Sequence, residues 1–581
     1  MSRRRRERLP ALTPAPEPFP WTWALGAASF TIRLLYWQAT SDASWPHTAA
    51  FKGDALLWLE YARALREGRL FELGLPIHPP GTAYLVAALW SGSGGFAVLK
   101  VVWCALGAAA VALAASAIAR AFGRGVGAMA GVVMAASSGL LMLSTSLNGE
   151  TPYLALVAAG FRLLPGDEDP PRSGRLAAWS AVQGAACLFR VEHVLFVLLA
   201  LSFMTARALR RGSPGRAASV LAIGIGAFVL PLVPWHVAAW HAVARFNAEP
   251  PPTPPSVRQV LDQLRGIPWD LGARSRLAAL PAFARDQSEA FVAATVAHRG
   301  GTRVREMDVD VLREAFGAEA RPLRAHPFVS LYGPLNFALA NHPEATPGFG
   351  HAALDVPPPL AGGRGAYPAM LIAGLPPREL ALTYPPHLAL VNDGYGIGWR
   401  WMTSDPGRAV RRAALRLGRF WAGAATMLTG YALPAGPSGT RHAVDITVAG
   451  GWIANVWRIA LLVASLAGLA AAWRRAALYP WLFLLVTRAA AAVMFFGYAR
   501  LGATAIPVVA LLLALAIERS RPGMGERFGW RLAGRALAFL VAIEAARWLQ
   551  HPALALDGEA AGPHDPVPSA DNRDHELKVS F

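Results

Sequence analysis

Cysteines and charged residues are scarce in this sequence. Only two of its 581 residues are cysteines and 16% are charged, whereas soluble chains carry about a quarter charged residues. Cys104 and Cys187 are too few for a disulfide framework, and their spacing matches no zinc motif. We therefore expect two ordinary buried thiols, in a chain that is not a typical soluble protein.

Familiar catalytic signatures are missing as well. The sequence contains no Walker A motif, no GxSxG, no HExxH and no Rossmann fingerprint. Chemistry driven by a nucleotide inside the cell therefore has no support. No internal repeat is evident either, which counts mildly against a transporter built from duplicated halves.

Long apolar runs are what the sequence does contain. Hydrophobic residues make up 54% of the chain, and runs of about 18 or more recur, which indicates an integral membrane protein. The formal net charge is +18. The arginines cluster beside apolar runs, as in "SRRRRER" and "RALRRGSPGR", which is typical of cytoplasmic topology signals. We therefore expect no nucleic-acid partner.

The predicted fold class is mostly α, a polytopic membrane protein with about eleven transmembrane helices. It includes extracytoplasmic interfacial helices and a large extracytoplasmic region. The predicted spans are 21–39, 95–119, 125–145, 150–164, 174–189, 191–208, 217–238, 452–473, 477–498, 501–517 and 532–549. The first span follows the basic N-terminus and is interpreted as a retained signal-anchor.

The chain divides into five predicted parts. These are a cytoplasmic basic N-terminus (1–20), an N-terminal transmembrane module (21–240), an extracytoplasmic region (241–450), C-terminal transmembrane helices (451–550) and a flexible tail (551–581). The first arginine cluster should stay inside, which makes residues 40–80 the first outer loop. The segment 78–90 is too short to span alone and is predicted to be re-entrant or interfacial.

The proline-rich middle region contains one distinctive helix signal. In "SDPGRAVRRAALRLGRFWAG" (404–423), Asp405 and Pro406 are typical of a helix start. Arginines recur there at helical spacing opposite Val410, Leu417 and Trp421, at positions 408, 412, 416 and 419. We expect a basic amphipathic helix on the outer membrane surface.

Two acids are candidates for chemistry. Asp54 opens "GDALLWLEYARALREGRL" and could simply cap a helix, or a fixed carboxylate at the membrane surface could deprotonate an acceptor. Glu150 opens a predicted span on the same membrane face. Its negative charge could interact favourably with the N-terminal end of the helix dipole, with Thr151 as the helix cap and Pro152 at the first helical position. Alternatively, Asp54 and Glu150 act together on an acceptor or hold a metal cation.

Charged residues at or within predicted spans are costly and tend to face a polar cavity or a partner. They are Arg33, Arg190, Glu192, Arg488 and Arg500. Arg190 and Glu192 could pair with each other or mark the interface. Arg488 lies nearest mid-span and is the hardest to explain. Arg500 lies at the outer end of its span, where a guanidinium could hold a lipid phosphate.

His78 precedes two prolines in "IHPPG". Such a histidine is most often a turn residue with a solvated ring. The alternative is contact with a phosphate or a metal beside Asp54. Both interpretations stay open at this point.

These segments, in this order, resemble the polytopic GT-C glycosyltransferases of the dolichyl-phosphate-mannose protein mannosyltransferase and aminoarabinose transferase type. The resemblance covers most of residues 25–520 and lies in the order of loose motifs. They are "FTIRLLYW", "GDALLWLEYARALREGR", "HPPGTAYLVAAL", "SLNGETPYLALV", "GAACLFRVEHVLF", "LPLVPWHVAAWHAVARFN", "FALANHPEATPGFG", "NDGYGIGWRWMTSDPGRAVRRAALRLGRFW" and "YARLGATAIPVVALLL".

The resemblance implies a membrane glycosyltransferase that moves a sugar from a polyprenyl-phosphate donor to an extracytoplasmic glycan, lipid or protein. Asp54 matches the family's base and Glu150 its second acid. Arg500 matches its phosphate-binding arginine, and His78 and Arg190 are further candidates for the donor phosphate. Aminoarabinose transferases carry a lysine where this chain has His78, which leaves the sugar and the donor contact there in doubt. A divalent cation, held by Asp54 and Glu150 if at all, is not required by the resemblance.

Two other functions remain as alternatives. Arg488 and the many spans would also suit a transporter or flippase of a lipid-linked or polar solute. A GT-C-like fold could also serve as a non-catalytic scaffold. The Ala-, Arg- and Gly-rich composition is typical of a bacterium with a high-GC genome, so we expect the inner membrane, with the active site facing the periplasm.

Overall fold

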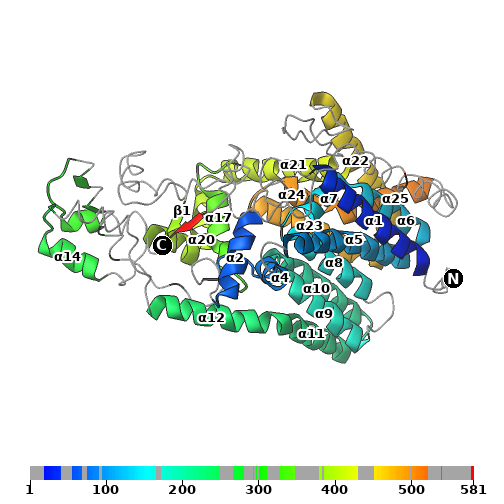
Figure 1. Cartoon of the computed structure of the whole chain (residues 1–581), viewed down its shortest axis with the longest axis horizontal. Coiled ribbons are helices and arrows are strands. Elements are labelled where there is room, and N and C mark those ends of the chain that lie inside the picture. The colour runs from blue at the N-terminus through cyan, green and yellow to red at the C-terminus, as the bar shows by residue number, and fades with distance from the viewer. Residues whose placement is uncertain are drawn as a thin grey trace, which may run out of the picture.

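The computed structural model shows a protein built almost entirely of helices (Figure 1). It describes residues 19–40, 55–68, 75–90, 95–164, 172–248, 266–279, 300–310, 328–346, 379–381, 385–429, 451–497, 499–520 and 578–580, with isolated positions at 285–297, 323 and 538. In this part of the chain the only strands are β1 (Glu379–Ala381) and β2 (Lys578–Ser580), which pair in parallel. The predicted mostly helical fold is confirmed, although β2 gives three residues of the predicted flexible tail a regular structure.

Several helices are long and apolar enough to cross a membrane. Within the described residues these are Val98–Phe122, Val191–Arg210, Pro214–Ala248, Asn455–Ala472 and Ala476–Met494. A sixth span is present if α6 (Arg124–Ala136) and α7 (Ser138–Thr145) count as one. The chain is thus consistent with a helical multi-span membrane protein, but the predicted number of about eleven spans is not confirmed.

The helices that hold these spans have the following bounds: α5 (Gly95–Phe122), η2 (Val191–His193), α10 (Val194–Arg210), α11 (Pro214–Val229), η3 (Leu230–Leu232), α12 (Val233–Ala248), α22 (Gly451–Ala472), η5 (Ala476–Leu478) and α23 (Tyr479–Met494).

Other predicted spans form helices that do not meet the same test. They are α1 (Phe19–Thr40), α8 (Glu150–Leu163), α9 (Ser173–Cys187) and α25 (Ile506–Ser520). The last three have only 14, 15 and 15 residues, fewer than the roughly 20 that cross a bilayer. The predicted span 532–549 lies outside the described residues except for position 538.

Ser137 breaks the predicted span 125–145. The chain is extended at this residue, and α6 and α7 meet there at 58°. The Ser137 hydroxyl accepts a hydrogen bond from the Leu140 amide and donates one to the Met427 carbonyl of α21 (Pro406–Thr429). Because the serine caps α7 and ties the junction to a distant helix, the predicted span 125–145 is bent at this residue, and it is one span only if the bent pair counts as one.

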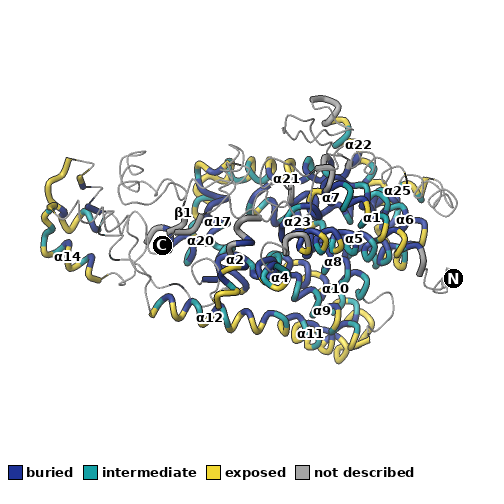
Figure 2. The backbone as a smooth tube through the Cα atoms, viewed as in Figure 1, coloured by how far each residue is buried: buried dark blue, intermediate teal, exposed yellow. Residues whose placement is uncertain are grey.

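One helical segment is longer than a membrane is thick. Gly212, with a φ of +72°, provides the left-handed turn after α10 that only glycine adopts easily, and Pro214 occupies the first turn of α11. From there α11, η3 and α12 run on as 35 helical residues to Ala248, about 52 Å by helical rise. The predicted module boundary at residue 240 therefore falls inside a helix. Figure 2 shows much of its length exposed.

The remaining helices are short or peripheral: α2 (Ala55–Arg66), α4 (Gly81–Leu89), α14 (Leu271–Ala278), α17 (Tyr332–Asn341), α20 (Pro385–Ser404) and α24 (Ala499–Ala503). With nine residues, α4 is too short to cross a bilayer. This agrees with the prediction that the segment 78–90 does not span by itself.

Helix α21 begins where the sequence predicts, but its basic and apolar faces are not oriented as predicted. Asp405 accepts a hydrogen bond from the Arg408 amide at 2.9 Å, just before Pro406. However, Val410 is 70% exposed and Arg416 only 2%. The predicted basic surface helix thus turns part of its arginine face toward the protein and part of its apolar face outward.

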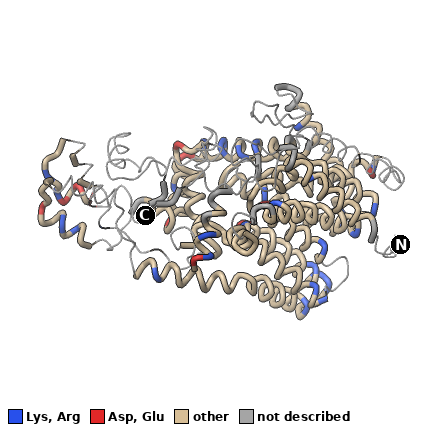
Figure 3. The backbone as a smooth tube through the Cα atoms, in the orientation of Figure 1, with Lys and Arg blue, Asp and Glu red and all other residues tan. Residues whose placement is uncertain are grey.

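Two clusters of buried apolar residues form most of the core. The larger one lies among α5, α6, α8, α9, α10 and α25. A smaller one joins Leu75 and Ile77 to Leu331, Leu388 and Phe496, so the loop before α4 packs against segments more than 250 residues away in sequence. Charged residues lie mostly at helix ends and along α21 (Figure 3). Cys104 and Cys187 are buried and free, as predicted.

Candidate active site

The segment before α4 is anchored to the C-terminal end of α9. The Gly81 amide donates a hydrogen bond to the Leu188 carbonyl at 2.8 Å. A Cβ added at Gly81 would lie 2.8 Å from the Phe189 ring, so a larger residue would push the two segments apart. Gly81 therefore holds the chain after His78 directly beside the residues that precede Arg190.

His78 is buried among aromatic side chains. Its ring lies 4.2 Å from that of Tyr332, between centroids. Its Nδ1 is 3.3 Å from the Tyr61 hydroxyl, and Trp58 meets the ring edge-on. The interpretation as a turn residue with a solvated ring was wrong, because α2 and α17 cover the ring. Contact with a donor phosphate stays a prediction.

Glu150 is the first residue of α8 and forms an ion pair with Arg190. Asn148 provides the side-chain cap, accepting a hydrogen bond from the Thr151 amide at 3.0 Å. Thr151 and Pro152 therefore lie within the first turn of α8, and the predicted capping role of Thr151 was wrong. Glu150 is almost fully buried, whereas a fifth of the Arg190 side chain remains exposed. The carboxylate thus fixes a guanidinium that can still meet a ligand.

The ion pair continues into a chain of four charges. Arg190 lies 3.6 Å from Glu192, and Glu192 lies 3.0 Å from Arg488. Arg488 also lies over the Tyr153 ring, 5.2 Å from its centroid. Two arginines and two carboxylates balance within the bundle, which reduces the high cost of charge in an apolar setting. The mid-span Arg488 is thereby explained.

A neutral network extends from the same place. The Tyr153 hydroxyl is 3.0 Å from His193 Nδ1, and His193 Nε2 is 2.6 Å from the Gln183 Oε1 atom. Because His193 Nε2 faces an acceptor, it carries the proton, and Nδ1 then accepts from tyrosine. Sequence reasoning missed these three residues, although the histidine follows Glu192 directly in "RVEH".

Arginines of α21 bind the end of α17, which sequence reasoning also missed. Arg412 donates to the carbonyls of His342 and Pro343, and Arg416 donates to the Ala340 carbonyl and Asn341 Oδ1. Cations satisfy the unpaired carbonyls and the negative dipole at a helix C-terminus. The spacing of four residues between these arginines was the available signal.

These contacts shift the ionisation of the groups at the end of α17. Burial, followed by the positive charges of Arg412 and Arg408, lowers the pKa of His342 to about 4. Burial and the charge of Arg412 lower the pKa of Arg416 to about 10. His342 is therefore neutral near pH 7 and Arg416 remains charged.

Asp54 and the side chain of Arg500, two of the predicted site groups, lie outside the described residues. Asp54 lies outside the described residues, directly before α2, whose Trp58 and Tyr61 contact His78. Arg500 lies in the backbone of α24, and its side chain is outside the described part. A Cβ at Gly502 would meet the Phe420 carbonyl at 2.5 Å, so α24 packs closely on α21. The relation of Asp54 to Arg500 remains a prediction.

The described residues contain no group of three His, Cys, Asp or Glu side chains that could hold a metal ion. Glu150, one of the two acids predicted for such a site, already has Arg190 as its cationic partner. A hard divalent cation prefers several oxygen ligands. Glu150 with Arg190 does not fit that requirement.

The chain matches no protein-family profile and no curated protein. Solved structures similar to it include ArnT from Cupriavidus metallidurans bound to undecaprenyl phosphate, at 14% identity and a TM-score of 0.30, covering 86% of this chain and 78% of that one. An oligosaccharyltransferase from Archaeoglobus fulgidus, tethered with an acceptor peptide, has 12% identity and a TM-score of 0.32, covering 93% of this chain and 55% of that one. With both TM-scores below 0.5, neither likeness carries an argument about activity.

Proposed function

We propose that this protein is a membrane glycosyltransferase of the GT-C type. It would transfer a sugar from a polyprenyl-phosphate donor to an extracytoplasmic glycan, lipid or protein acceptor by inverting displacement. The site would lie where the start of α2, the loop before α4, the start of α8 and the end of α9 come together, facing the periplasm of an inner-membrane protein.

The observation that carries the proposal is the convergence of motifs that are distant in sequence. Tyr61 of α2 and Tyr332 of α17 both contact His78. The Gly81 amide binds the Leu188 carbonyl, two residues before Arg190, which pairs with Glu150. Four of the segments that carry the family resemblance therefore meet at one place, and they include three of the five residues expected to act on substrate.

In the proposed reaction, an acceptor oxygen or nitrogen attacks the anomeric carbon of the donor. The bond from this carbon to the phosphate oxygen breaks, and the lipid phosphate leaves with the electron pair. Asp54 takes the proton of the acceptor, a role that fits a carboxylate within reach of the nucleophile. One bond forms as one breaks, so the configuration at the anomeric carbon is inverted.

Charge that develops on the leaving phosphate would be stabilised by cations. Arg500 and Arg190 are proposed to bind this phosphate as hydrogen-bond donors, and His78 is a third candidate for the same role. Arg190 suits this role because Glu150 holds one side of its guanidinium while a fifth of the side chain is exposed; a bidentate guanidinium matches phosphate geometry. Glu150 itself serves better by positioning Arg190 than as a base, because its carboxylate is already bound to that guanidinium. No step is assigned to a metal ion.

The proposal is tested with the purified full-length protein in lipid nanodiscs. Labelled undecaprenyl-phosphate sugars are offered with an envelope extract from a deletion strain as acceptor. Asp54→Asn should lower transfer by roughly 10² to 10⁴-fold, the usual contribution of a general base. Asp405→Asn is the matched control, since asparagine caps a helix as well as aspartate and should leave transfer unchanged.

Equal transfer by the Asp54→Asn protein and the parent would exclude the proposed base. If the parent shows no transfer while a deletion strain has normal envelope glycans, a non-catalytic scaffold is favoured instead. Solute flux in vesicles without donor turnover would indicate a transporter. No observation now favours the transporter specifically, because Arg488, which suggested it, is paired with Glu192.

A further inference from the structure

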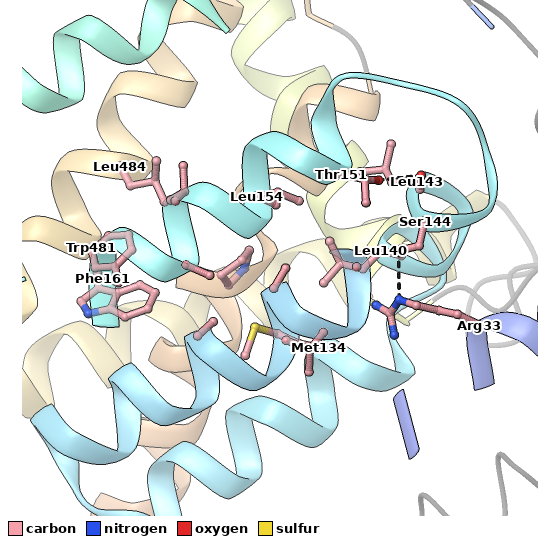
Figure 4. A pocket seen from close by; sticks show the side chains of 17 residues that line it. Arg33, Met134, Leu140, Leu143, Ser144, Thr151, Leu154, Phe161, Trp481 and Leu484 are labelled. Atoms are coloured by element: carbon pink, nitrogen blue, oxygen red, sulfur yellow. Dashed lines mark hydrogen bonds between the residues drawn. The ribbon is translucent and has the colours of Figure 1, made fainter. Parts of the chain in front are cut away.

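An apolar cavity lies within the helical bundle, and α8 forms one of its walls. The cavity is partly open, and its empty space together with the open solvent at its mouth measures about 480 Å³. Side chains of α1, α5, α6, α7, α8, α23 and α25 line it, and all but three of the lining residues are apolar or glycine. Figure 4 shows Arg33 at one end of this cavity and the Phe161 and Trp481 rings at the other.

Arg33 is the one charged side chain among the described residues that line the cavity. It is completely buried. Its Nε donates to the Ser144 hydroxyl at 2.9 Å, and Nη1 donates to the carbonyl and hydroxyl of Ser29. Nη2 has no hydrogen-bond partner among the described residues. In Figure 4 the guanidinium nitrogens point toward the cavity.

No carboxylate compensates this guanidinium within the described part of the chain. All of its partners are neutral oxygens, whereas Arg190 and Arg488 in the same bundle each pair with an acid. An arginine at membrane depth costs several kcal/mol unless a partner or a polar cavity receives it. Removing the partner of a buried charge is strongly destabilising. Arg33 Nη2 therefore offers an anion a charged, unused hydrogen-bond donor.

The other polar groups limit the anion to a small one with a single charge. The Ser144 hydroxyl donates to the Leu140 carbonyl, and the Thr151 hydroxyl donates to the Leu143 carbonyl. Neither is free to donate to a ligand as well, because a hydroxyl has one proton. A Cβ at Gly107 would lie 2.8 Å from Arg33 Nε, so space around the guanidinium is narrow. A carboxylate fits these conditions, whereas a bulkier phosphate with two charges does not.

We propose that this cavity binds a single-chain fatty carboxylate, with its head group on Arg33 Nη2 and its hydrocarbon chain along α8 toward Phe161 and Trp481. The path from Thr151 to Phe161 covers about 15 Å by helical rise, and apolar side chains line it throughout. Each buried methylene adds roughly 0.8 kcal/mol, so the chain supplies the affinity and Arg33 selects the charge. This site is independent of the proposed sugar transfer.

The test measures binding of oleate to the full-length protein in nanodiscs. Oleyl alcohol provides the chain without the charge, acetate the charge without the chain, and hexadecyl phosphate a larger, more highly charged head group. Oleate should bind more tightly than the other three. Arg33→Gln should weaken oleate binding roughly ten- to a hundredfold, the usual loss for a hydrogen bond to a charged group, and should leave oleyl alcohol binding unchanged.

A second variant keeps the test valid if Arg33→Gln fails to fold. Ala158 lines the cavity, whereas the neighbouring Ala159 does not. Ala158→Phe should abolish oleate binding, and Ala159→Phe should not. Equal oleate binding in the parent and Ala158→Phe would overturn the proposal. Tighter binding of hexadecyl phosphate than of oleate would overturn the assignment of a carboxylate.

Discussion

Arg488 of α23 and Glu192 of η2, just before α10, form an ion pair of 3.0 Å across 296 positions of sequence. Glu192 also approaches Arg190, which holds Glu150. The four side chains therefore tie α8, the end of α9 and α23 to each other beside the proposed site. Arg488, a charged residue in the middle of an apolar run, thus has a structural role, because it links these helices.

We expect Arg488→Met to destabilise the protein by up to about 3–5 kcal/mol, because it leaves the charge of Glu192, whose side chain is 22% exposed, with only the more distant Arg190. Thermal unfolding in detergent measures this as a lower Tm. The double variant Glu192→Gln/Arg488→Met should recover most of the loss, since it leaves no unpaired charge. A double variant as unstable as the single one would contradict the ion-pair explanation.

Gly81→Ala should lower both Tm and any transferase activity, because the added methyl group would lie 2.8 Å from the Phe189 ring and move the loop bearing His78 away from α9. Overpacking of this kind typically costs about 1–3 kcal/mol. Gly226→Ala on α11 is the control. Its Cβ meets nothing within 4 Å, and alanine favours a helix over glycine by up to about 1 kcal/mol. A Tm unchanged by Gly81→Ala would show that α4 can shift freely.

His342 should make stability depend on pH in the acid range. Its pKa is about 4 in the folded protein, against 6.5 for an ordinary histidine. Between these values the unfolded chain binds a proton that the folded protein excludes. The contribution of His342 to the free energy of unfolding is therefore fully present above about pH 6.5. It falls as pH drops toward 4, by at most about 1.4 kcal/mol per pH unit.

The matching measurement is Tm against pH for the parent and for His342→Gln. The variant should lose part of the slope between pH 4 and 6.5, while the two curves should run parallel above pH 7. In the parent protein the Glu344 amide donates a hydrogen bond to His342 Nδ1 at 3.2 Å. The side-chain oxygen of glutamine can accept the same hydrogen bond. Curves that are parallel over the whole range would contradict the lowered pKa.

Arg416→Ala should destabilise the contact between α21 and α17. This side chain is buried and binds Asn341 Oδ1 and the carbonyls of Ala340 and Val493, so truncation leaves three acceptors unsatisfied at about 1–3 kcal/mol each before relaxation. Arg419→Ala on the same helix is the control because Arg419 is exposed. Hydrogen exchange at the end of α17 should quicken in the first variant only. Equal exchange in both would mean that Arg416 does not hold α17.

Sequence patterns predicted the helical class, the two buried thiols and the start of α21 at Asp405. Each of these depends on composition or on local hydrogen bonding, which neighbouring residues determine. The number of spans was not predictable in the same way. Ser137 interrupts an apolar run that looks continuous, and it does so through a bond to the Met427 carbonyl, 290 positions away.

The candidate site, too, was predictable from the sequence only in part. Asp54, His78, Glu150, Arg190 and Arg500 were selected by residue type, position and resemblance. The partners of His78 and Arg488 were not foreseen, because Tyr61, Tyr332 and Glu192 reach them only through tertiary packing. The buried arginine face of α21 was missed for a related reason. A helical pattern gives the angle between residues, but it does not say which side the rest of the protein occupies.

The 35-residue helical segment from Pro214 to Ala248 has a mechanical consequence. It exceeds the hydrocarbon thickness of a bilayer by roughly 20 Å, and near its far end Asn247 exchanges two hydrogen bonds with the backbone of Leu323. If the segment crosses a bilayer, its excess length carries the end that binds Leu323 out of the hydrocarbon region. We then expect a change in bilayer thickness that tilts the segment to displace the backbone around Leu323 as well.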